Sequence, residues 1–247
     1  MSKQSDYQQA LRNMEDWEAF LLKESCLPGP RSNLELLYAV REEGDEARLT
    51  RFFRYPLEQA ATNTPGEFLV ACGVAGLGRL VAEGQLDWLK TLRAFASDPR
   101  WRVREAVAMA LQRFGSQNME SLLKEMRVWS QGSPLERRAV VAAVCEPALL
   151  RQPEHAEAVL NLLDEITASI LQAPDRKSED FRVLRQALGY GLSVAAVASP
   201  QAGKRLLEKW LATPDKDIRW ILKENLKKQR LIRMDPAWVE SCLKSLS

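Results

Sequence analysis

One stretch decides the fold, and it reads Asp98-Pro99-Arg100-Trp101-Arg102-Val103-Arg104-Glu105-Ala106-Val107-Ala108-Met109-Ala110-Leu111-Gln112-Arg113-Phe114. It predicts a helix, because Asp98 can cap the first free N–H groups and Pro99 suits the first helical position. Gly115 is predicted to end the helix. The apolar residues follow helical spacing and form one stripe for burial, made of Val103, Ala106, Val107, Ala110, Leu111 and Phe114.

The same pattern returns along the chain. Stretches aligned on Arg104 contain Arg137, Arg185 and Arg219 at the same place, and residues 70–77 match without the arginine. The anchor positions 70, 104, 137, 185 and 219 are separated by 34, 33, 48 and 34 residues. Self-similarity at this period predicts a solenoid of helical repeats.

These residues resemble the HEAT-repeat family. The resemblance rests on Asp98, followed by Val103-Arg104 and by small and apolar residues up to Leu111, and it covers the chain from about residue 32 onward. It implies an all-α, right-handed superhelix in which aspartate and arginine form a ladder between neighbouring repeats. We therefore expect residues 1–247 to form a single HEAT-like solenoid domain. Residues 1–64 would be an irregular N-terminal cap, 65–229 the repeats, and 230–247 a C-terminal capping helix.

Turn and capping signals predict the individual helices. Three glycines in the helix expected over 67–82, Gly73, Gly76 and Gly78, are predicted to permit close helix packing, since no strand or Lys-Ser/Thr accompanies them as a phosphate-binding loop requires. No stretch alternates as strands do. The other expected helices cover 7–24, 33–41, 46–53, 86–96, 119–129, 134–146, 155–172, 181–198, 204–211, 216–229 and 236–246.

Charge is distributed unevenly. The formal net charge is only +2, but residues 1–50 carry six Lys/Arg against ten Asp/Glu, whereas residues 200–233 carry ten Lys/Arg against four Asp/Glu. An acidic start and a basic end predict an electric field directed at one end of the molecule.

Metal, redox and membrane functions are not predicted. The four cysteines, Cys26, Cys72, Cys145 and Cys242, form no CxxC pair, and His155 is the only histidine. We expect reduced thiols packed in helices, no metal and no cofactor. The chain starts without a signal-peptide core, and no apolar run approaches the roughly 20 residues that span a bilayer. The sequence therefore predicts a soluble cytoplasmic protein.

Equivalent positions on successive repeats form rows on the concave face, which gives the candidate binding residues. Trp101 and Glu105 share one helix face, and Arg138 and Tyr190 would lie on neighbouring helices. An aromatic ring can stack on a base, a carboxylate can stabilise a developing cation, and an arginine can hold a phosphate. In the alternative interpretation, Glu105 and Arg138 form an inter-repeat ion pair and the two aromatic rings pack against their neighbours. The three rows are Trp101, Pro134, Arg182 and Lys216; Glu105, Arg138, Gln186 and Trp220; and Met109, Ala142, Tyr190 and Glu224.

A second resemblance concerns function. Residues 129–141, together with Asp180-Phe181 and residues 185–190, are similar to the AlkD-type DNA glycosylases, HEAT-like proteins that remove alkylated bases. The resemblance implies that Trp101 and Glu105 replace that family's aromatic–aspartate pair, with Glu105 as the catalytic carboxylate. Arg138 would replace its arginine and Tyr190 its tryptophan. The family's double-tryptophan motif is absent, and Glu105 and Tyr190 differ in type from the residues they would replace.

The basic end favours nucleic acid independently. Six cations lie along one expected helix and its end, where they could contact phosphates. In the alternative interpretation they complement a solvated helix terminus. They are Lys216, Arg219, Lys223, Lys227, Lys228 and Arg230.

Two functional hypotheses remain. The first is a concave-face binding protein with AlkD-like nucleic-acid binding linked to DNA alkylation repair. The second is a noncatalytic protein-interaction scaffold. Binding is favoured over catalysis. The predicted binding residues are Trp101, Arg138, Arg182, Tyr190, Lys216, Trp220, Lys223 and Lys227.

Overall fold

The computed structural model describes residues 2–246 and consists of helices joined by turns and loops. Over this range it contains fifteen α-helices, two short 3-10 helices and no strands, which confirms the all-α class. The chain divides into two compact units, Met1–Asn118 (unit 1) and Met119–Ser247 (unit 2), and each is described by itself. The expected single solenoid with two caps stays a prediction.

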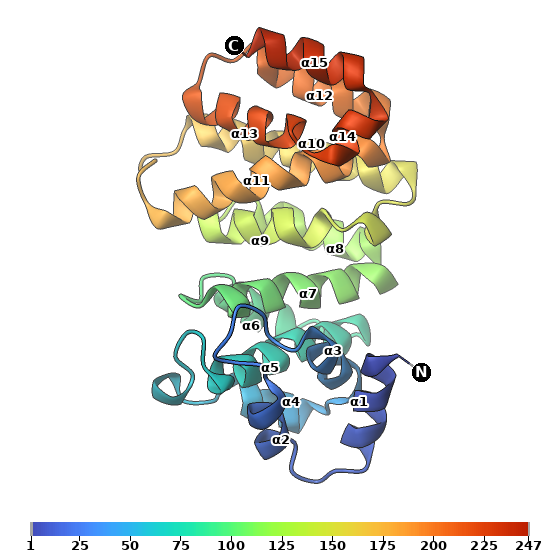
Figure 1. Cartoon of the computed structure of the whole chain (residues 1–247), viewed down its shortest axis with the longest axis vertical. Helices are drawn as coiled ribbons and strands as arrows, with labels where there is room; N and C mark the ends of the chain where they lie inside the picture. The colour runs from blue at the N-terminus through green and yellow to red at the C-terminus, as the bar shows by residue number, and fades with distance from the viewer. Residues whose placement is uncertain (1, 247) are drawn as a thin grey trace. The chain divides into compact units, whose positions relative to one another are not determined.

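Unit 1 is built around its longest helix, α5 (Pro65–Ala82), which packs against α2, α3, α4, α6 and α7 (Figure 1). Almost all of α5 is buried, as the central position requires. By length and composition α5 is apolar enough to cross a membrane, with a mean hydropathy of 1.3, but 83% of that span is buried inside the structure, as in the core helix of a soluble protein. The other helices are α1 (Lys3–Arg12), α2 (Trp17–Glu24), α3 (Leu34–Glu43), α4 (Glu46–Phe53), α6 (Trp88–Phe95) and α7 (Trp101–Gln117), with a 3-10 turn at Leu57–Gln59.

The glycines of α5 permit the close packing that the sequence predicts. A Cβ atom on Gly78 would lie 2.4 Å from Ala110 Cα and 2.3 Å from its carbonyl oxygen, so the backbones of α5 and α7 are in direct contact there. A Cβ atom on Gly73 would lie 2.6 Å from the backbone nitrogen of Phe53. No larger residue fits at Gly78 unless the two helices separate.

The predicted start and end of α7 are wrong. Helix α7 begins at Trp101 and not at Pro99, and it continues through Gly115 to Gln117. Asp98 does not cap the helix, because its carboxylate accepts from the backbone N–H of Arg100 at 2.8 Å and from the Arg100 guanidinium at 2.7 and 2.8 Å. Gly115 is buried within the helix, where a small residue serves packing rather than termination.

The predicted helix over 7–24 is also wrong, since two helices occupy this range. Helix α1 ends at Arg12, and Asp16 caps α2 by accepting from the N–H groups of Glu18 and Ala19. The indole N–H of Trp17 holds the connecting turn by donating to the carbonyls of Leu11 (2.9 Å) and Met14 (3.1 Å).

Unit 2 contains two layers of helices. Helices α9, α11 and α13 pack side by side in one layer, and α11 lies in the middle of that layer (Figure 1). Helices α8, α10 and α12 pack side by side in the other layer. Ser133 begins α9 with a capping box to Glu136, as the Ser-Pro signal predicts. The bounds are α8 (Met119–Trp129), α9 (Pro134–Val144), α10 (Pro153–Leu171), α11 (Glu179–Ala198), α12 (Pro200–Leu211), α13 (Lys216–Leu226), α14 (Gln229–Met234) and α15 (Pro236–Ser245), with a 3-10 turn at Pro147–Leu149.

The predicted helix over 216–229 ends early. Helix α13 stops at Leu226, and a separate short helix, α14, follows. Asn225 is fully buried beside the break and joins α13 to α11: its amide accepts from Ser193 N–H at 2.7 Å and donates to the Leu188 carbonyl at 2.9 Å. The break turns the chain so that Arg230 approaches α11.

The four anchor arginines have three kinds of partner, and Arg219 donates to the Leu246 carbonyl at 2.7 Å. Arg185 on α11 donates to Asp217 on α13 at 2.5 Å, which is the contact between neighbouring helices that a ladder requires. Arg104 and Arg137 each donate to a carbonyl in the turn before their own helix, at Asp98 (2.7 Å) and Ser130 (2.9 Å). These hydrogen bonds hold the helices in place, which is a structural role.

Candidate functional site

Unit 1 contains a pocket beside the face of α7 that carries Trp101 and Glu105. Trp101, Glu105 and Met109 lie one turn apart on that helix and line a pocket of about 200 Å³. Two exposed apolar side chains border it, Trp101 at 47% and Leu34 at 40% exposure. Sequence analysis missed the opposite wall, because it comes from the loop before α3 and from α3 and α5. That wall consists of Pro30, Arg31, Ser32, Leu34, Leu37 and Ala71.

A buried ion pair supports the Trp101 side of this pocket. The Arg102 guanidinium lies 4.6 Å from the centroid of the Trp101 ring and donates to Glu67 at 3.1 Å and to the Gly29 carbonyl at 2.9 Å. Glu67 is fully buried and Arg102 is 8% exposed. Within residues 2–246, Oε1 of Glu67 and Nε of Arg102 have no hydrogen-bond partner.

Unit 2 presents an aromatic ring beside two cations. Tyr190 on α11 is 50% exposed, and Arg230 on α14 lies 4.4 Å from its ring centroid. Arg230 also donates to the Tyr190 hydroxyl at 2.6 Å, and the Lys228 ammonium lies 5.5 Å from the ring. No described carboxylate forms an ion pair with Lys228 or Arg230. We call Tyr190, Lys228 and Arg230 the tyrosine cluster.

A second aromatic–cation contact joins α11 to α13. The Arg185 guanidinium is 4.5 Å from the centroid of the Trp220 ring. A Cβ atom on Gly189 would lie 3.0 Å from this ring, so the indole packs over α11 at a glycine. Trp220 is therefore partly a packing residue, in contrast to Tyr190.

The other predicted residues of unit 2 have separate surroundings. Arg182 is exposed and pairs with Glu179 on its own helix, and Lys227 pairs with Glu224 at 2.6 Å. Lys216 and Lys223 are exposed on α13 and form no ion pair with the described residues, and Arg138 is half-buried on α9. The predicted cluster of Trp101, Glu105, Arg138 and Tyr190 is divided between the two units, so it is not one described site.

The buried thiols are unsuited to nucleophilic chemistry. Burial raises the pKa of Cys72 well above its ordinary value, and burial, opposed by the charge of Arg230, raises the pKa of Cys145 to about 12. Both thiols therefore stay protonated near neutral pH. The prediction that all four cysteines pack in helices is wrong for Cys26, which is exposed in the loop after α2.

Comparison with known proteins adds nothing to this description: no family model matches the chain, and no curated protein and no solved structure matches it.

Proposed function

We propose that this protein binds nucleic acid without catalysis, through the surface that α11, α13 and α14 form in unit 2. A right-handed superhelix of HEAT-like repeats and a cytoplasmic location are parts of the same proposal. The observation that carries it is the tyrosine cluster, in which a half-exposed ring lies beside two cations that no described carboxylate neutralises.

The chemistry of the cluster suits a nucleic-acid strand. Proteins that bind single-stranded nucleic acid without sequence preference combine cations along the phosphates with aromatic rings on which bases stack. The cations can contact the phosphates of a duplex as well. Two like charges held against one ring repel each other, and a phosphate at this position would relieve that repulsion. Lys216 and Lys223 extend the positive surface along α13.

Catalysis is not part of the proposal. The carboxylate that the AlkD-type resemblance implies, Glu105, lies in unit 1, whereas the cations lie in unit 2. Release of an alkylated base from DNA by the full chain, abolished by Glu105→Gln, would add base excision to the binding function.

The first experiment measures binding of a fluorescent DNA duplex over a salt series. Tight binding at low salt that falls steeply as salt rises is expected, because released counterions drive phosphate contacts. The double variant Lys223→Ala/Lys227→Ala and the variant Arg230→Ala should each bind more weakly. The double variant should also reduce the slope of log K against log salt by about 1 to 2, since each lost phosphate contact contributes about 0.9.

A matched control removes the same charge elsewhere in unit 2. Lys124 and Arg127 are exposed on α8, in the other helix layer, so Lys124→Ala/Arg127→Ala should leave the affinity unchanged. Equal loss of binding in both double variants would mean that net charge alone matters and would reject the surface of α11, α13 and α14 as the site. Absence of binding at low salt would reject the function.

A noncatalytic protein-interaction scaffold is the second candidate, and the pocket beside Trp101 favours it. An exposed tryptophan and an exposed leucine at one pocket are typical of an anchor site for a partner side chain. Trp101→Ala and Leu34→Ala should weaken such a complex, whereas Leu86→Ala, at another exposed leucine of unit 1, should not. None of these three variants should change DNA affinity, so the two candidates are distinguishable.

A further inference from the structure

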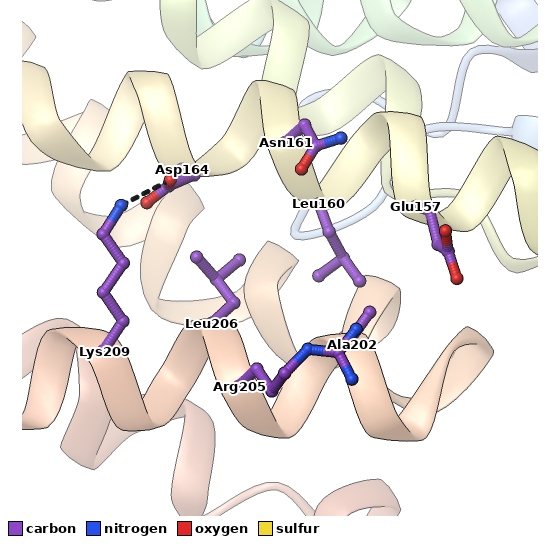
Figure 2. Close-up of a pocket in the computed structure, with 8 residues that line it drawn as sticks. All are labelled: Glu157, Leu160, Asn161, Asp164, Ala202, Arg205, Leu206 and Lys209. Atoms are coloured by element: carbon purple, nitrogen blue, oxygen red, sulfur yellow. Dashed lines mark hydrogen bonds and ion pairs between the residues drawn. The ribbon is translucent and has the colours of Figure 1, made fainter.

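Helices α10 and α12 of unit 2 border a groove of about 260 Å³ (Figure 2). Leu160 and Leu206 are buried and Ala202 is half-buried, and together they provide its apolar surface. The polar side chains have opposite charge on the two helices. Glu157, Asn161 and Asp164 come from α10, and Arg205 and Lys209 come from α12.

One end of the groove is closed by its own side chains. Asp164 accepts from the Lys209 ammonium at 2.6 Å and from the Trp210 indole N–H at 2.8 Å, as the dashed line to Lys209 in Figure 2 indicates for the first contact. Both carboxylate oxygens are thereby occupied. A ligand has no ionic partner to gain at this end.

The other end of the groove is open because Ala202 occupies the position at which a cation could pair with Glu157. Asp164 and Lys209 face each other at a separation of 45 residues, and the same separation places Ala202 opposite Glu157. Ala202 cannot reach the carboxylate. Glu157 and Arg205 are both exposed, and neither forms an ion pair with any residue from 2 to 246.

We propose that this open end binds a small zwitterion, an aliphatic α-amino acid. Its ammonium group would pair with Glu157, its carboxylate with Arg205, and its side chain would cover Leu160 and Leu206. Asn161 lies one helical turn from Glu157 on α10 and can donate to the carboxylate or accept from the ammonium group. A cavity of about 150 Å³ accommodates benzene, so a groove of this size has room for a side chain such as that of leucine.

This site is independent of the proposed function. It lies on α10 and α12, whereas the tyrosine cluster lies on α11 and α14. Because Glu157 and Arg205 are exposed to water, each ionic contact contributes little, and binding in the millimolar range is expected.

The experiment uses the full chain labelled with ¹⁵N and titrates it with leucine and two analogues that each lack one charge. These are 3-methylbutylamine, without the carboxylate, and 4-methylpentanoate, without the ammonium group. Leucine should shift the amide signals of residues 157–164 and 202–206. Each analogue should bind about threefold to fivefold more weakly, the effect of one exposed ion pair.

Variants test the two ends of the ligand. Arg205→Gln should weaken leucine binding to the level of 3-methylbutylamine, and Arg151→Gln, at another exposed arginine of unit 2, should not change it. Ala202→Lys should weaken leucine binding to the level of 4-methylpentanoate, because the new ammonium group would pair with Glu157 as Lys209 pairs with Asp164, whereas Ala202→Ser should preserve it. No shift in this groove with leucine, or equal shifts with all three compounds, would overturn the proposal, as would undiminished binding in Ala202→Lys.

Discussion

At the scale of single residues, the pair of Glu67 and Arg102 has the largest expected effect on stability. Both side chains are buried, and each lacks one hydrogen-bond partner among the described residues. A buried charge that loses its partner is strongly destabilising. Arg102→Met is therefore expected to lower the free energy of unfolding by about 3–5 kcal/mol, measured by urea denaturation.

The double variant provides the control for this pair. Glu67→Leu combined with Arg102→Met removes both charges, and a buried ion pair replaced by apolar residues often costs little. The double variant should be more stable than Arg102→Met alone. If the two are equally unstable, the contact of Arg102 with the Gly29 carbonyl and the Trp101 ring, and not its charge pairing, dominates.

Thiol reactivity gives a second prediction at this scale. Cys26 is exposed, whereas Cys72, Cys145 and Cys242 are buried and burial raises the pKa of each of the three. A thiol reagent applied to the native protein near pH 8 should label one cysteine quickly and the other three only in denaturant. Cys26→Ser should abolish the fast reaction. Fast labelling of Cys145 in that variant would contradict its burial.

At the scale of helices, a local capping signal predicted the start of α9 but not that of α2, which Asp16 caps. The predicted start of α9 at Pro134 is confirmed, because Ser133 and its capping partner Glu136 lie within one turn. The errors arise from contacts that are invisible in a local pattern. The Asp98 carboxylate accepts from the Arg100 guanidinium. That guanidinium also donates to the carbonyl of Ala60, 40 residues away in the sequence.

The candidate site was predictable only in part for the same reason. Trp101, Glu105 and Met109 follow one face of α7 by helical spacing and line one pocket, but the predicted grouping of Trp101 and Glu105 with Arg138 and Tyr190 stays a prediction. Leu34 lines that pocket because the fold brings the start of α3 beside α7. Arg230 contacts Tyr190 because the chain turns between α13 and α14. Periodicity contains no information on either path.

A comparison of Gly78 with Gly189 tests how closely the helices approach each other. Alanine is favoured over glycine within a helix by about 1 kcal/mol, but at Gly78 the new Cβ would collide with the Ala110 backbone. Gly78→Ala should destabilise by about 1–3 kcal/mol in thermal or urea unfolding. Gly189→Ala meets only side-chain atoms, at 3.0 Å or more, and should cost less. A Gly78→Ala variant of native stability would contradict the close approach of α5 and α7.

The start of α13 predicts a pH dependence. Burial alone would raise the pKa of Asp215, but hydrogen bonds from Arg176 and from the N–H groups of Ile218 and Asp217 lower it below its ordinary value. A lowered folded-state pKa stabilises the fold above the unfolded-state pKa of about 3.9, and this stabilisation is lost as the pH falls through the folded-state value.

Asp215→Asn tests this dependence, since asparagine also caps helices well. The variant should be less stable near pH 6 and should lose less stability between about pH 5 and about pH 2 than the native chain, as measured by thermal melting at each pH. Parallel stability curves for the two proteins would show that the Asp215 charge does not contribute.

At the scale of the whole molecule, the division at Asn118 gives the last prediction. Unit 2 has its own buried core and contains the complete tyrosine cluster. Residues 119–247 expressed alone should therefore be helical by circular dichroism, melt cooperatively, and bind DNA with the salt dependence of the full chain. A folded fragment that has lost DNA binding would assign an essential part of the interface to unit 1.

The loop before α3 also has a consequence for how unit 1 folds. Gly29 donates to Asn63 and accepts from Arg102, so its two hydrogen bonds span 34 and 73 residues of sequence. A contact that closes a long loop costs conformational entropy when it forms. Such contacts tend to form after the transition state of folding. Weakening these bonds should therefore accelerate unfolding while leaving the folding rate nearly unchanged. The contacts of Gly29 then contribute to the lifetime of native unit 1 and not to the speed with which it forms.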